Sequence, residues 1–405
     1  MNPTASIQPL CSQVFTPGAA ELPPADLARA VEDALALLPA EAEDIVVVVN
    51  DPQRHTATGA VWRELVARLD PTRLQVLIAC GSHAAPPPAQ RQAFERATLG
   101  EARPAAIDWH DSRASILQAV ESADAGGGGW RGHPWLLESD AVLAVGSLEP
   151  HYFAGWTGAH KTCTVGVAAY EAIERNHARA LDPRCRPAVL DDNPVADGVL
   201  AMLASLESRT PVAAVNLVQV EARILAAAGG SPRSALPACI PAASATFVRR
   251  IDARADAVVA EVTGPLGESF YQADKGIKNN EYAVRNGGCL VLVAACPLGV
   301  GQDRFLRLLR RAATHAEALA AVRSEGYRLG DHKAVRLRYL TDPACRGVRV
   351  YVVSEGLRKT DAAVLGLRKA ASPAAALADA GIDPASGPVV WVQDAGNLCV
   401  TGPSG

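Results

Sequence analysis

DIVVVVN, at residues 44–50, is a run of β-branched residues with no polar alternation inside it, and LQVLIAC at 74–80 and AVLAV at 141–145 are closely similar. Short runs of this type are typical of strands buried on both faces of a sheet. Apolar residues recur at helical spacing over residues 24–38 and 59–69. The alternation predicts β-α-β units and a largely parallel sheet.

The same alternation continues through the rest of the chain. A helix is predicted over residues 195–207, and the Gly-, Ser-, Pro- and Ala-rich stretch 229–241 is interpreted as a linker. The remaining predicted strands are Val212–Val220, 257–262, 290–294, 335–339, 348–353 and 389–392. The remaining predicted helices are 304–324 and 359–371. AGGGG at 125–129 is predicted to be a flexible surface loop. A chain of 405 residues is too long for one ordinary core. We therefore expect two α/β domains with largely parallel sheets, an N-terminal one over residues 1–250 and a C-terminal one over residues 251–405.

Composition excludes several classes of protein. The formal net charge is −4 and no Lys/Arg-rich run occurs, so the electrostatic footprint of a nucleic-acid binder is missing. No apolar stretch approaches the roughly 20 residues that a membrane span requires, and the N-terminus lacks the basic start and apolar core of a signal peptide. The nine cysteines are odd in number and form no C-x-x-C, which indicates reduced, mostly buried thiols. A cytoplasmic protein without a nucleic-acid or membrane partner is expected.

Polar residues suited to acid–base and anion-binding chemistry follow the three N-terminal strands. Asp51 and Arg54 come after the first strand, Ser82 and His83 after the second, and His151 after the third. Ligands of open parallel sheets bind beyond the carboxyl ends of the strands. Taken singly, Asp51 before a proline is a common turn residue, and a lone histidine such as His83 is more often a turn or packing residue. Their convergence at one sheet edge favours a functional site.

The most informative stretch is EPHYFAGWTGAHKTCTVGVAAYEAIERNH, at residues 149–177. Three glycines surround Lys161 and give a backbone that a ligand can approach closely. The helical pattern that follows, over residues 167–180, carries His177 near its far end. Without further information, Lys161 is equally well a solvated loop lysine, and His177 a cation favoured by the helix dipole.

The stretch resembles the lactate racemase family, whose members share Pro-His, Phe-Ala-Gly, a glycine pair, a lysine and a later Asn-His. His151 and Lys161 are ten residues apart and Lys161 and His177 sixteen, as in the motif of that family. DPQR at residues 51–54, GSH at 81–83 and the segment 272–275 also occur in the family's order and at comparable intervals. The resemblance covers most of the chain.

This resemblance implies an isomerase, a racemase or epimerase of 2-hydroxy acids, that uses a nickel-pincer nucleotide. The cofactor is a pyridinium-3-thioamide-5-thiocarboxylic acid mononucleotide that carries nickel, and separate enzymes synthesise it. Lys161 matches the lysine to which it is covalently attached. His177 matches the histidine that completes the nickel coordination, and imidazole is a suitable nickel donor. Asp51 and Ser82 match residues that support the bound cofactor.

The resemblance also implies roles for the remaining candidates. His83 and His151 match the paired acid/base histidines, whose ordinary pKa of about 6.5 permits both roles near neutral pH. A hydride route through a planar 2-keto acid needs one such base for each enantiomer. Arg54, Gln272 and Lys275 match substrate-facing groups, and Arg54 offers a forked donor to a carboxylate. Because Lys275 comes from the second half of the chain, we expect the active site in a cleft that the C-terminal domain closes over the cofactor-binding N-terminal domain.

One position departs from the family pattern. Many relatives carry an arginine directly before the tethered lysine, whereas this chain has His160. We interpret the difference as the mark of a subgroup with another substrate or altered cofactor contacts. His332 and Lys333 lie between a predicted helix and a predicted strand and are weaker candidates for the cleft. Tyr152 and Trp156 are candidates for the pocket wall, although aromatic packing also explains them.

Two other functions are compatible with the same residues. A zinc-dependent hydrolase would hold the metal with His83, His151 and His177 and activate a water molecule. It would leave Lys161 and Lys275 without a task. A non-catalytic protein that binds an organic acid or a nucleotide would keep its ligand affinity after the loss of either acid/base histidine. The substrate is open among lactate and longer aliphatic, aromatic, dicarboxylic and sugar acids.

Overall fold

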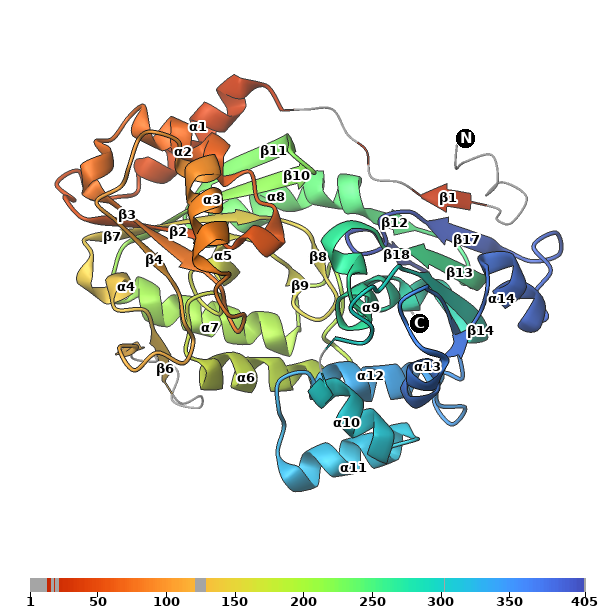
Figure 1. The fold of residues 1–405 in the computed structure, drawn as a ribbon. Coiled ribbons are helices and arrows are strands. Elements are labelled where there is room, and N and C mark those ends of the chain that lie inside the picture. The colour runs from red at the N-terminus through yellow and green to blue at the C-terminus, as the bar shows by residue number, and fades with distance from the viewer. Residues whose placement is uncertain (1–12, 16–17, 19–21, 121–128, 302, 404–405) are drawn as a thin grey trace.

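The computed structural model consists of two α/β halves, each built on a six-stranded sheet, and Figure 1 shows them side by side. It describes residues 13–403 apart from 16–17, 19–21, 121–128 and 302. The expected α/β class with largely parallel sheets is confirmed. The loop predicted at residues 125–129 falls almost entirely outside the described residues.

The first sheet contains every strand predicted before residue 220. Its order is β11 (Arg223–Gly230), β10 (Val212–Val220), β7 (Ala141–Ser147), β2 (Ile45–Asn50), β3 (Leu74–Ala79) and β4 (Ala106–Trp109). All neighbours are parallel except β10 and β11. The chain continues from β2 toward β4 on one side and from β7 toward β10 on the other. The boundary between β2 and β7 is therefore the switch point at which such sheets bind ligands.

Helices cover both faces of this sheet, which is why its central strands are mainly apolar. Val47 and Val49 pack in one core with α1 (Pro24–Leu35), α2 (Thr58–Val66) and the end of α3 (Pro88–Leu99). Val46 and Val48 pack in the opposite core with α5 (Ala159–Thr162), α6 (Tyr170–Ala178) and α7 (Pro194–Glu207). Because both side-chain rows are buried, most polar residues of these strands lie near the strand ends, and the buried Asn216 inside β10 accepts a hydrogen bond.

The second sheet is parallel at every pairing. Its order is β1 (Gln13–Phe15), β17 (Val389–Val392), β13 (Ala255–Glu261), β14 (Val284–Val293), β15 (Arg349–Val353) and β16 (Arg368–Lys369). Its switch point lies between β13 and β17. β1 belongs to this sheet although it precedes the first half of the chain, so a division at residue 250 does not hold for residues 13–15.

Helices also cover this second sheet on both faces. The larger core contains α9 (Phe270–Asn280), α10 (Asp303–Arg311), α11 (His315–Glu325), α12 (Asp331–Thr341) and α13 (Lys359–Leu365), and α14 (Pro373–Asp379) covers the opposite face.

The first half also contains two pairs of short strands and a short helix. The pairs are β5 (Gln118–Val120) with β6 (Trp130–Gly132) and β8 (Pro150–His151) with β9 (Gly155–Trp156), and the helix is α4 (Trp135–Glu138).

The strand predicted at residues 335–339 is wrong, because these residues lie inside α12. VRLRY alternates apolar and basic residues, which imitates a half-buried strand. Arg338 is nevertheless buried, and its guanidinium donates hydrogen bonds to the carbonyl oxygens of Leu309, Ala312, Val364 and Leu365. Arg338 therefore faces the core, where it satisfies carbonyl oxygens at two helix ends.

Three further predictions are corrected by capping and packing. The stretch 229–241 is the end of β11 followed by α8 (Pro232–Phe247), which buries Leu236 and Phe247 in a core with β10 and contains two internal prolines. The helix predicted over 304–324 is broken before Thr314, which forms a capping box with Glu317. The helix predicted over 359–371 ends at Gly366, whose φ is +77°.

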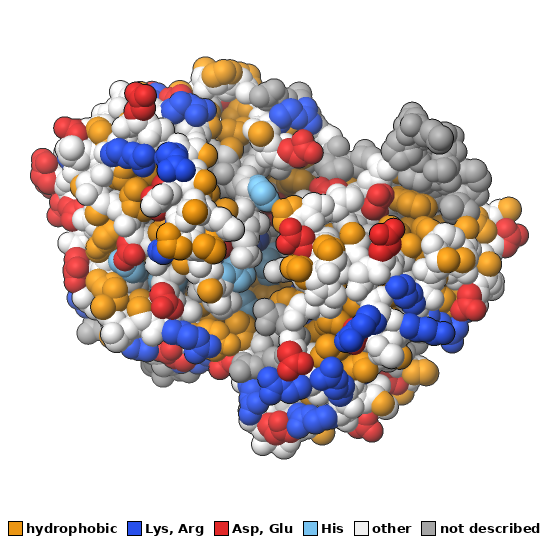
Figure 2. Space-filling view, viewed as in Figure 1, with side chains coloured by type: hydrophobic (Ala, Val, Ile, Leu, Met, Phe, Trp, Pro, Cys, Tyr) orange, Lys and Arg blue, Asp and Glu red, His pale blue; other side chains and the backbone are white. Residues whose placement is uncertain are grey.

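The two switch points face each other across the boundary between the halves. α8 leads into β12 (Val248–Arg250), which pairs with β18 (Cys399–Thr401) at the C-terminal end of the chain. Side-chain contacts that cross the boundary include Lys275 with Glu149 and Tyr152 with His332. Figure 2 shows the hollow between the halves, with histidine side chains inside it.

Two expectations about the chain as a whole can be compared with the described residues. Within them, we find no helix of the length and apolarity needed to cross a membrane. Their eight cysteines are free, and all but Cys345 are buried, as predicted; Cys11 lies outside the described residues.

Candidate active site

A cavity opens at the carboxyl ends of β2, β3 and β7, where the sequence placed the candidate residues. Seven of the nine predicted site residues line it: Asp51, Arg54, Ser82, His83, His151, Lys161 and His177. Asn50, Thr157 and Thr162 add polar groups, and Gly81, Gly158 and Gly166 leave parts of its wall without side chains. Residues from Asn50 to His177, 127 positions apart in the sequence, therefore converge on one space.

Lys161 is positioned by a short helix that lies directly against the central strand. Gly146 of β7 makes this approach possible, since a Cβ there would lie 2.3 Å from the Ala159 nitrogen and 2.5 Å from the Gly158 carbonyl carbon. The Ala159 N–H donates to the side-chain oxygen of Asn216 on β10, at 2.8 Å. The helix that carries Lys161 is thus fixed by backbone packing against β7 and by a hydrogen bond to a side chain of β10.

The amine of Lys161 has neither a hydrogen-bond nor an ion-pair partner among the described residues. Its Nζ lies 5.8 Å from the ring centre of Phe153. Burial, with Arg54 and Lys275 nearby, lowers the pKa of Lys161 well below its ordinary value. The neutral amine, which is the nucleophilic form, is therefore favoured.

His177 presents one ring nitrogen to the cavity and uses the other for support. Its Nδ1–H donates to the carbonyl oxygen of Ile173, one turn earlier in α6, at 2.8 Å. Its ring packs edge-on against Phe153 at 5.0 Å and lies 6.1 Å from the ring of His332. Burial, followed by the charge of Lys161, lowers the pKa of His177 to about 3. The ring is neutral, and its Nε2 carries the lone pair that a metal ion needs.

His151 lies on the tight β8–β9 hairpin that follows β7. Its Nδ1 accepts the N–H of Ala154 at 3.3 Å, and its ring stacks on Tyr152 with 5.2 Å between the ring centres. Burial, followed by the charges of Lys161 and Arg54, lowers the pKa of His151 well below its ordinary value. In the neutral ring, the bonded Nδ1 leaves the proton on Nε2.

The second half of the molecule holds this hairpin in place. Arg336 of α12 donates to the carbonyl oxygens of Tyr152, at 3.2 Å, and Cys185, at 3.0 Å, while it pairs with Glu281 at 2.9 Å. The hydroxyl of Tyr152 lies 3.0 Å from Nε2 of His332. The position of His151 therefore depends on residues more than 180 positions later in the sequence.

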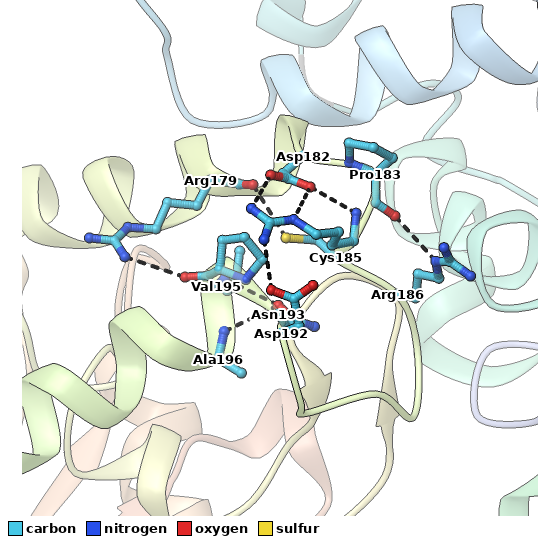
Figure 3. Close-up of polar contacts among 11 residues, drawn as sticks. Arg179, Asp182, Pro183, Cys185, Arg186, Asp192, Asn193, Val195 and Ala196 are labelled. Atoms are coloured by element: carbon cyan, nitrogen blue, oxygen red, sulfur yellow. Dashed lines mark hydrogen bonds and ion pairs between the residues drawn. The ribbon is translucent and has the colours of Figure 1, made fainter.

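The first half adds a second support for the hairpin, at the start of α7. The side-chain oxygen of Asn193 accepts the N–H groups of Val195 and Ala196 as a helix cap, which Figure 3 shows together with the bonds around Cys185. The amide nitrogen of Asn193 donates to the carbonyl oxygen of Phe153 at 3.0 Å. The cap thus ties the hairpin to a helix of the first half.

His83 differs from His151 in exposure and in partner. Its side chain is 42% exposed, and its Nδ1 lies 3.2 Å from the carboxylate of Asp51, which is 6% exposed. Asp51 is itself oriented by the backbone N–H of Gln53, which donates to its other oxygen. A carboxylate at Nδ1 places the ring proton there and leaves Nε2 as an acceptor.

Gln272 and Lys275 are not among the residues that line the cavity. Lys275 lies on α9 and extends across the boundary to Glu149, at 3.5 Å, and to the side-chain oxygen of Asn397, at 3.4 Å. It is close enough to lower the pKa values of both His151 and Lys161 by its charge. Gln272 lies one turn earlier on the same helix and is half-buried.

Sequence patterns gave too little weight to three residues near this site. His332 bonds the hydroxyls of both Tyr152, at 3.0 Å, and Tyr327, at 2.6 Å. Arg336 and Glu149 were not singled out at all. Glu149 could have been recognised, because it follows a buried strand. His332 and Arg336 contact the site through Tyr152, which lies 180 and 184 positions away in the chain.

His160, the departure from the family pattern, is 2% exposed and does not line the cavity. Its Nδ1 is near Gly158, on the side of the helix that faces Leu148 and Asn216. The replacement of the family's arginine by His160 therefore changes the packing of the helix that carries Lys161 and not the lining of the cavity.

A three-histidine zinc site receives no support from the geometry. Among the residues that the structure describes, no group of three or more His, Cys, Asp or Glu side chains is arranged to hold a metal ion. Nδ1 of His83 is engaged by Asp51, and Nδ1 of His151 by a backbone N–H. The donor set fits a metal that brings its other ligands with it.

Comparison with known proteins identifies sequence relatives of this chain. The family model described as lactate racemase N-terminal domain matches residues 26–187, and that described as lactate racemase C-terminal domain matches residues 251–331. The lactate racemase of Thermoanaerobacterium thermosaccharolyticum is 26% identical over 294 residues, which cover 70% of this chain and 67% of that protein. The lactate racemase of Lactiplantibacillus plantarum is 25% identical over 271 residues, covering 65% and 62%.

Solved structures show the same fold. The lactate racemase apoprotein from Thermoanaerobacterium thermosaccharolyticum superposes with a TM-score of 0.84 at 21% identity, covering 97% of this chain and 95% of that one. A protein from Thermotoga maritima superposes with a TM-score of 0.73 at 16% identity, covering 96% and 100%.

The fold, the cavity and the named relatives together define an enzyme, an isomerase of the racemase type. Its two halves correspond to the two domain models, which match the chain in the same order. The chain belongs to the lactate racemase family.

Proposed function

We propose that this racemase inverts C2 of a 2-hydroxy acid with the help of a nickel-pincer nucleotide attached to Lys161. One observation carries the proposal: Lys161 and His177 line the same cavity. The amine of Lys161 has no hydrogen-bond or ion-pair partner among the described residues, and its lowered pKa favours the neutral form. His177 uses Nδ1 for a backbone hydrogen bond, which leaves Nε2 available to a metal ion. One covalent anchor and one imidazole donor are what a nucleotide with its own metal ligands requires.

The residues present fit this group. The amine of Lys161 would form the covalent bond, His177 Nε2 would be the protein's ligand to nickel, and Asp51 and Ser82 would support the nucleotide from the ends of β2 and β3. When bound, the cofactor supplies a reversible hydride acceptor for C2 of the substrate. The glycine-lined parts of the wall leave room for a planar ring near the backbone.

Proton transfer is assigned to His83 and His151, whose tautomers are set in opposite senses. His83, with its Nδ1–H directed at Asp51, offers Nε2 as a base for the hydroxyl proton of one enantiomer. His151 is assigned to the other enantiomer; with Nδ1 bonded to the Ala154 N–H, its neutral ring presents Nε2–H as a hydrogen-bond donor to the substrate oxygen, and it can return a proton only after the ring has taken up a second one. The hydroxyl proton that one histidine takes from the first enantiomer is returned to the hydroxyl oxygen of the second, so a full turnover leaves the number of protons on the pair unchanged and the reaction can run in both directions.

The substrate carboxylate is assigned to the cations around the cavity. Arg54 lines the cavity and offers two parallel donors. Lys275 approaches from the second half, with Gln272 on the same helix, so closure of the halves would bring both onto a bound acid and exclude water. A reducing compartment such as the cytoplasm is supported by the eight free cysteines.

Mass spectrometry of the intact protein tests the anchor. Protein produced together with cofactor-synthesis enzymes is expected to carry the nucleotide mass, and Lys161→Ala is expected to lose both the mass and the turnover of 2-hydroxy acids. Lys359→Ala, at an exposed lysine on α13, is the matched control and keeps both. In His177→Ala the adduct remains while bound nickel, measured by elemental analysis, falls. Nickel-dependent turnover by Lys161→Ala would refute the proposal.

A further inference from the structure

A carboxylate from the first half of the molecule meets the substrate-facing lysine of the second half. Glu149 lies between two residues that line the cavity, Ser147 and His151, and its Oε2 is 3.5 Å from Nζ of Lys275. The two side chains are only 16% and 12% exposed. This ion pair crosses from the switch point of one sheet to that of the other.

The backbone of Glu149 is held firmly, so its carboxylate has a fixed origin. Its N–H donates to the hydroxyl of Thr157 at 2.8 Å, and its carbonyl oxygen accepts the Thr157 N–H at 2.9 Å. The Thr157 hydroxyl donates in turn to the carbonyl oxygen of Ser147 at 2.7 Å. Thr157 also lines the cavity, which places this clamp at the cavity rim.

Lys275 has three N–H donors, and the structure accounts for two of them. One points to Glu149, at 3.5 Å, and one to the side-chain oxygen of Asn397, at 3.4 Å. Asn397 is itself fixed, because its amide nitrogen donates to both oxygens of Asp394, at 3.0 and 3.1 Å. The third donor remains for another acceptor.

Several cationic or basic side chains lie near Lys275, together with the carboxylates of Glu149 and Asp394. Arg54 acts on it from the first half, and its own charge acts on Lys161, His151 and Lys333. Burial lowers the pKa of Lys275, and Glu149 opposes that shift more than any other neighbour, with Asp394 adding a smaller contribution. A nearly buried ammonium among other cations needs such a partner to stay charged.

We propose that Glu149 is a positioning residue: with Asn397, it holds the ammonium of Lys275 at the cavity rim and directs the free N–H to the substrate carboxylate. This inference rests on the proposed function, because it assigns Lys275 to the substrate. Glu149 itself makes no contact with the reacting atoms. Its effect is on how tightly the acid binds and over what pH range.

The test compares Glu149→Gln with Glu174→Gln. Glu174 of α6 also connects the halves, since it accepts the Leu329 N–H at 2.8 Å, but no contact joins it to Lys275. In the cofactor-loaded enzyme, Glu149→Gln is expected to raise KM for lactate about 10-fold or more, as loss of a charge-assisted bond implies, while kcat changes little. The rise of KM with pH, as Lys275 loses its proton, moves to lower pH. Glu174→Gln is expected to leave KM and its pH dependence unchanged.

A second measurement does not depend on turnover. NMR of the ¹³C-methylated lysines of cofactor-free protein gives the pKa of Lys275, identified by the signal that Lys275→Arg removes. We expect this pKa to fall in Glu149→Gln and to be unchanged in Glu174→Gln. An unchanged pKa of Lys275, or an unchanged KM, in Glu149→Gln would overturn the inference. If the wild-type enzyme turned over no 2-hydroxy acid, the proposed function would fail by itself, and the NMR titration would still decide whether Glu149 holds the charge on Lys275.

Discussion

Replacing Arg336 with methionine tests whether the second half of the molecule positions a catalytic histidine of the first. The guanidinium is 11% exposed and donates to the carbonyl oxygens of Tyr152 and Cys185 as well as to the carboxylate of Glu281. Methionine keeps much of the aliphatic volume and removes every donor. The variant therefore loses the bonds that fix the hairpin carrying His151 while the packing of α12 is largely retained.

The loss of stability in Arg336→Met depends on the carboxylate of Glu281, which loses its partner. Removing one partner of a buried ion pair costs about 3–5 kcal/mol, because the other charge is uncompensated. Glu281 retains Lys278 at 3.5 Å, so we expect the lower end, about 3 kcal/mol. For catalysis, a displacement of about 1 Å in a reacting group can cost on the order of 100-fold. We expect a fall in kcat of that order, since the residue next to His151 loses its anchor.

Two assays and one control separate the two effects. Urea unfolding followed by tryptophan fluorescence gives the stability, and chiral chromatography of a 2-hydroxy acid gives the turnover of cofactor-loaded protein. Arg338→Met is the control, because Arg338 is equally buried but donates only to carbonyl oxygens of the second half. It should lose stability and keep its kcat. Wild-type kcat in Arg336→Met would refute the positioning argument, whatever its stability.

Two further changes test the packing around Lys161. In Gly146→Ala the new Cβ would lie 2.3 Å from a backbone nitrogen of α5. The overpacking, about 1–3 kcal/mol, is expected to lower Tm in calorimetry and to reduce the yield of the Lys161 adduct in mass spectrometry. In the control, Gly129→Ala, the nearest atom would be 3.5 Å from the new Cβ, so both readouts should stay unchanged. Burial, followed by the charge of Lys161, lowers the pKa of His160 to about 3. The folded protein therefore favours the neutral ring, and this contribution to stability is complete above the ordinary pKa of 6.5. It is lost progressively as the pH falls toward 3. His160→Gln should therefore lose less stability than the wild type between pH 6.5 and 5, by up to about 1.4 kcal/mol per pH unit, and equal slopes in urea unfolding would contradict this.

Much of the site was predictable because parallel strands end at a common edge. Asp51, His83 and His151 each follow a strand that is recognisable from its apolar run, and the three strands are neighbours in one sheet. Lys161 and His177 were identified by the resemblance to the lactate racemase family, and both line the cavity at the same edge of the sheet. Local sequence thus contained both the chemistry and its approximate place.

The contacts that cross the two halves were beyond such reasoning. Tyr152 bonds His332 over 180 positions and Arg336 over 184, and no periodicity links residues at those separations. α12 carries both partners, and part of it was predicted to be a strand because VRLRY at residues 335–339 alternates apolar and basic residues. The burial of Arg338 in a helix could not be recognised from that alternation. Contacts of this kind exist only after both sheets have formed and packed.

By itself, the sequence determined the α/β class and the central strands of both sheets, because apolar runs are local properties of the chain, and its resemblance to the lactate racemase family identified the lysine and histidines at the cavity. The tertiary structure alone decided that Lys275 meets Glu149, that Arg336 holds the hairpin of His151, and that β1 joins the second sheet. The physical reason is that burial and charge at these positions are set by neighbours from the opposite half, and those neighbours become neighbours only through packing.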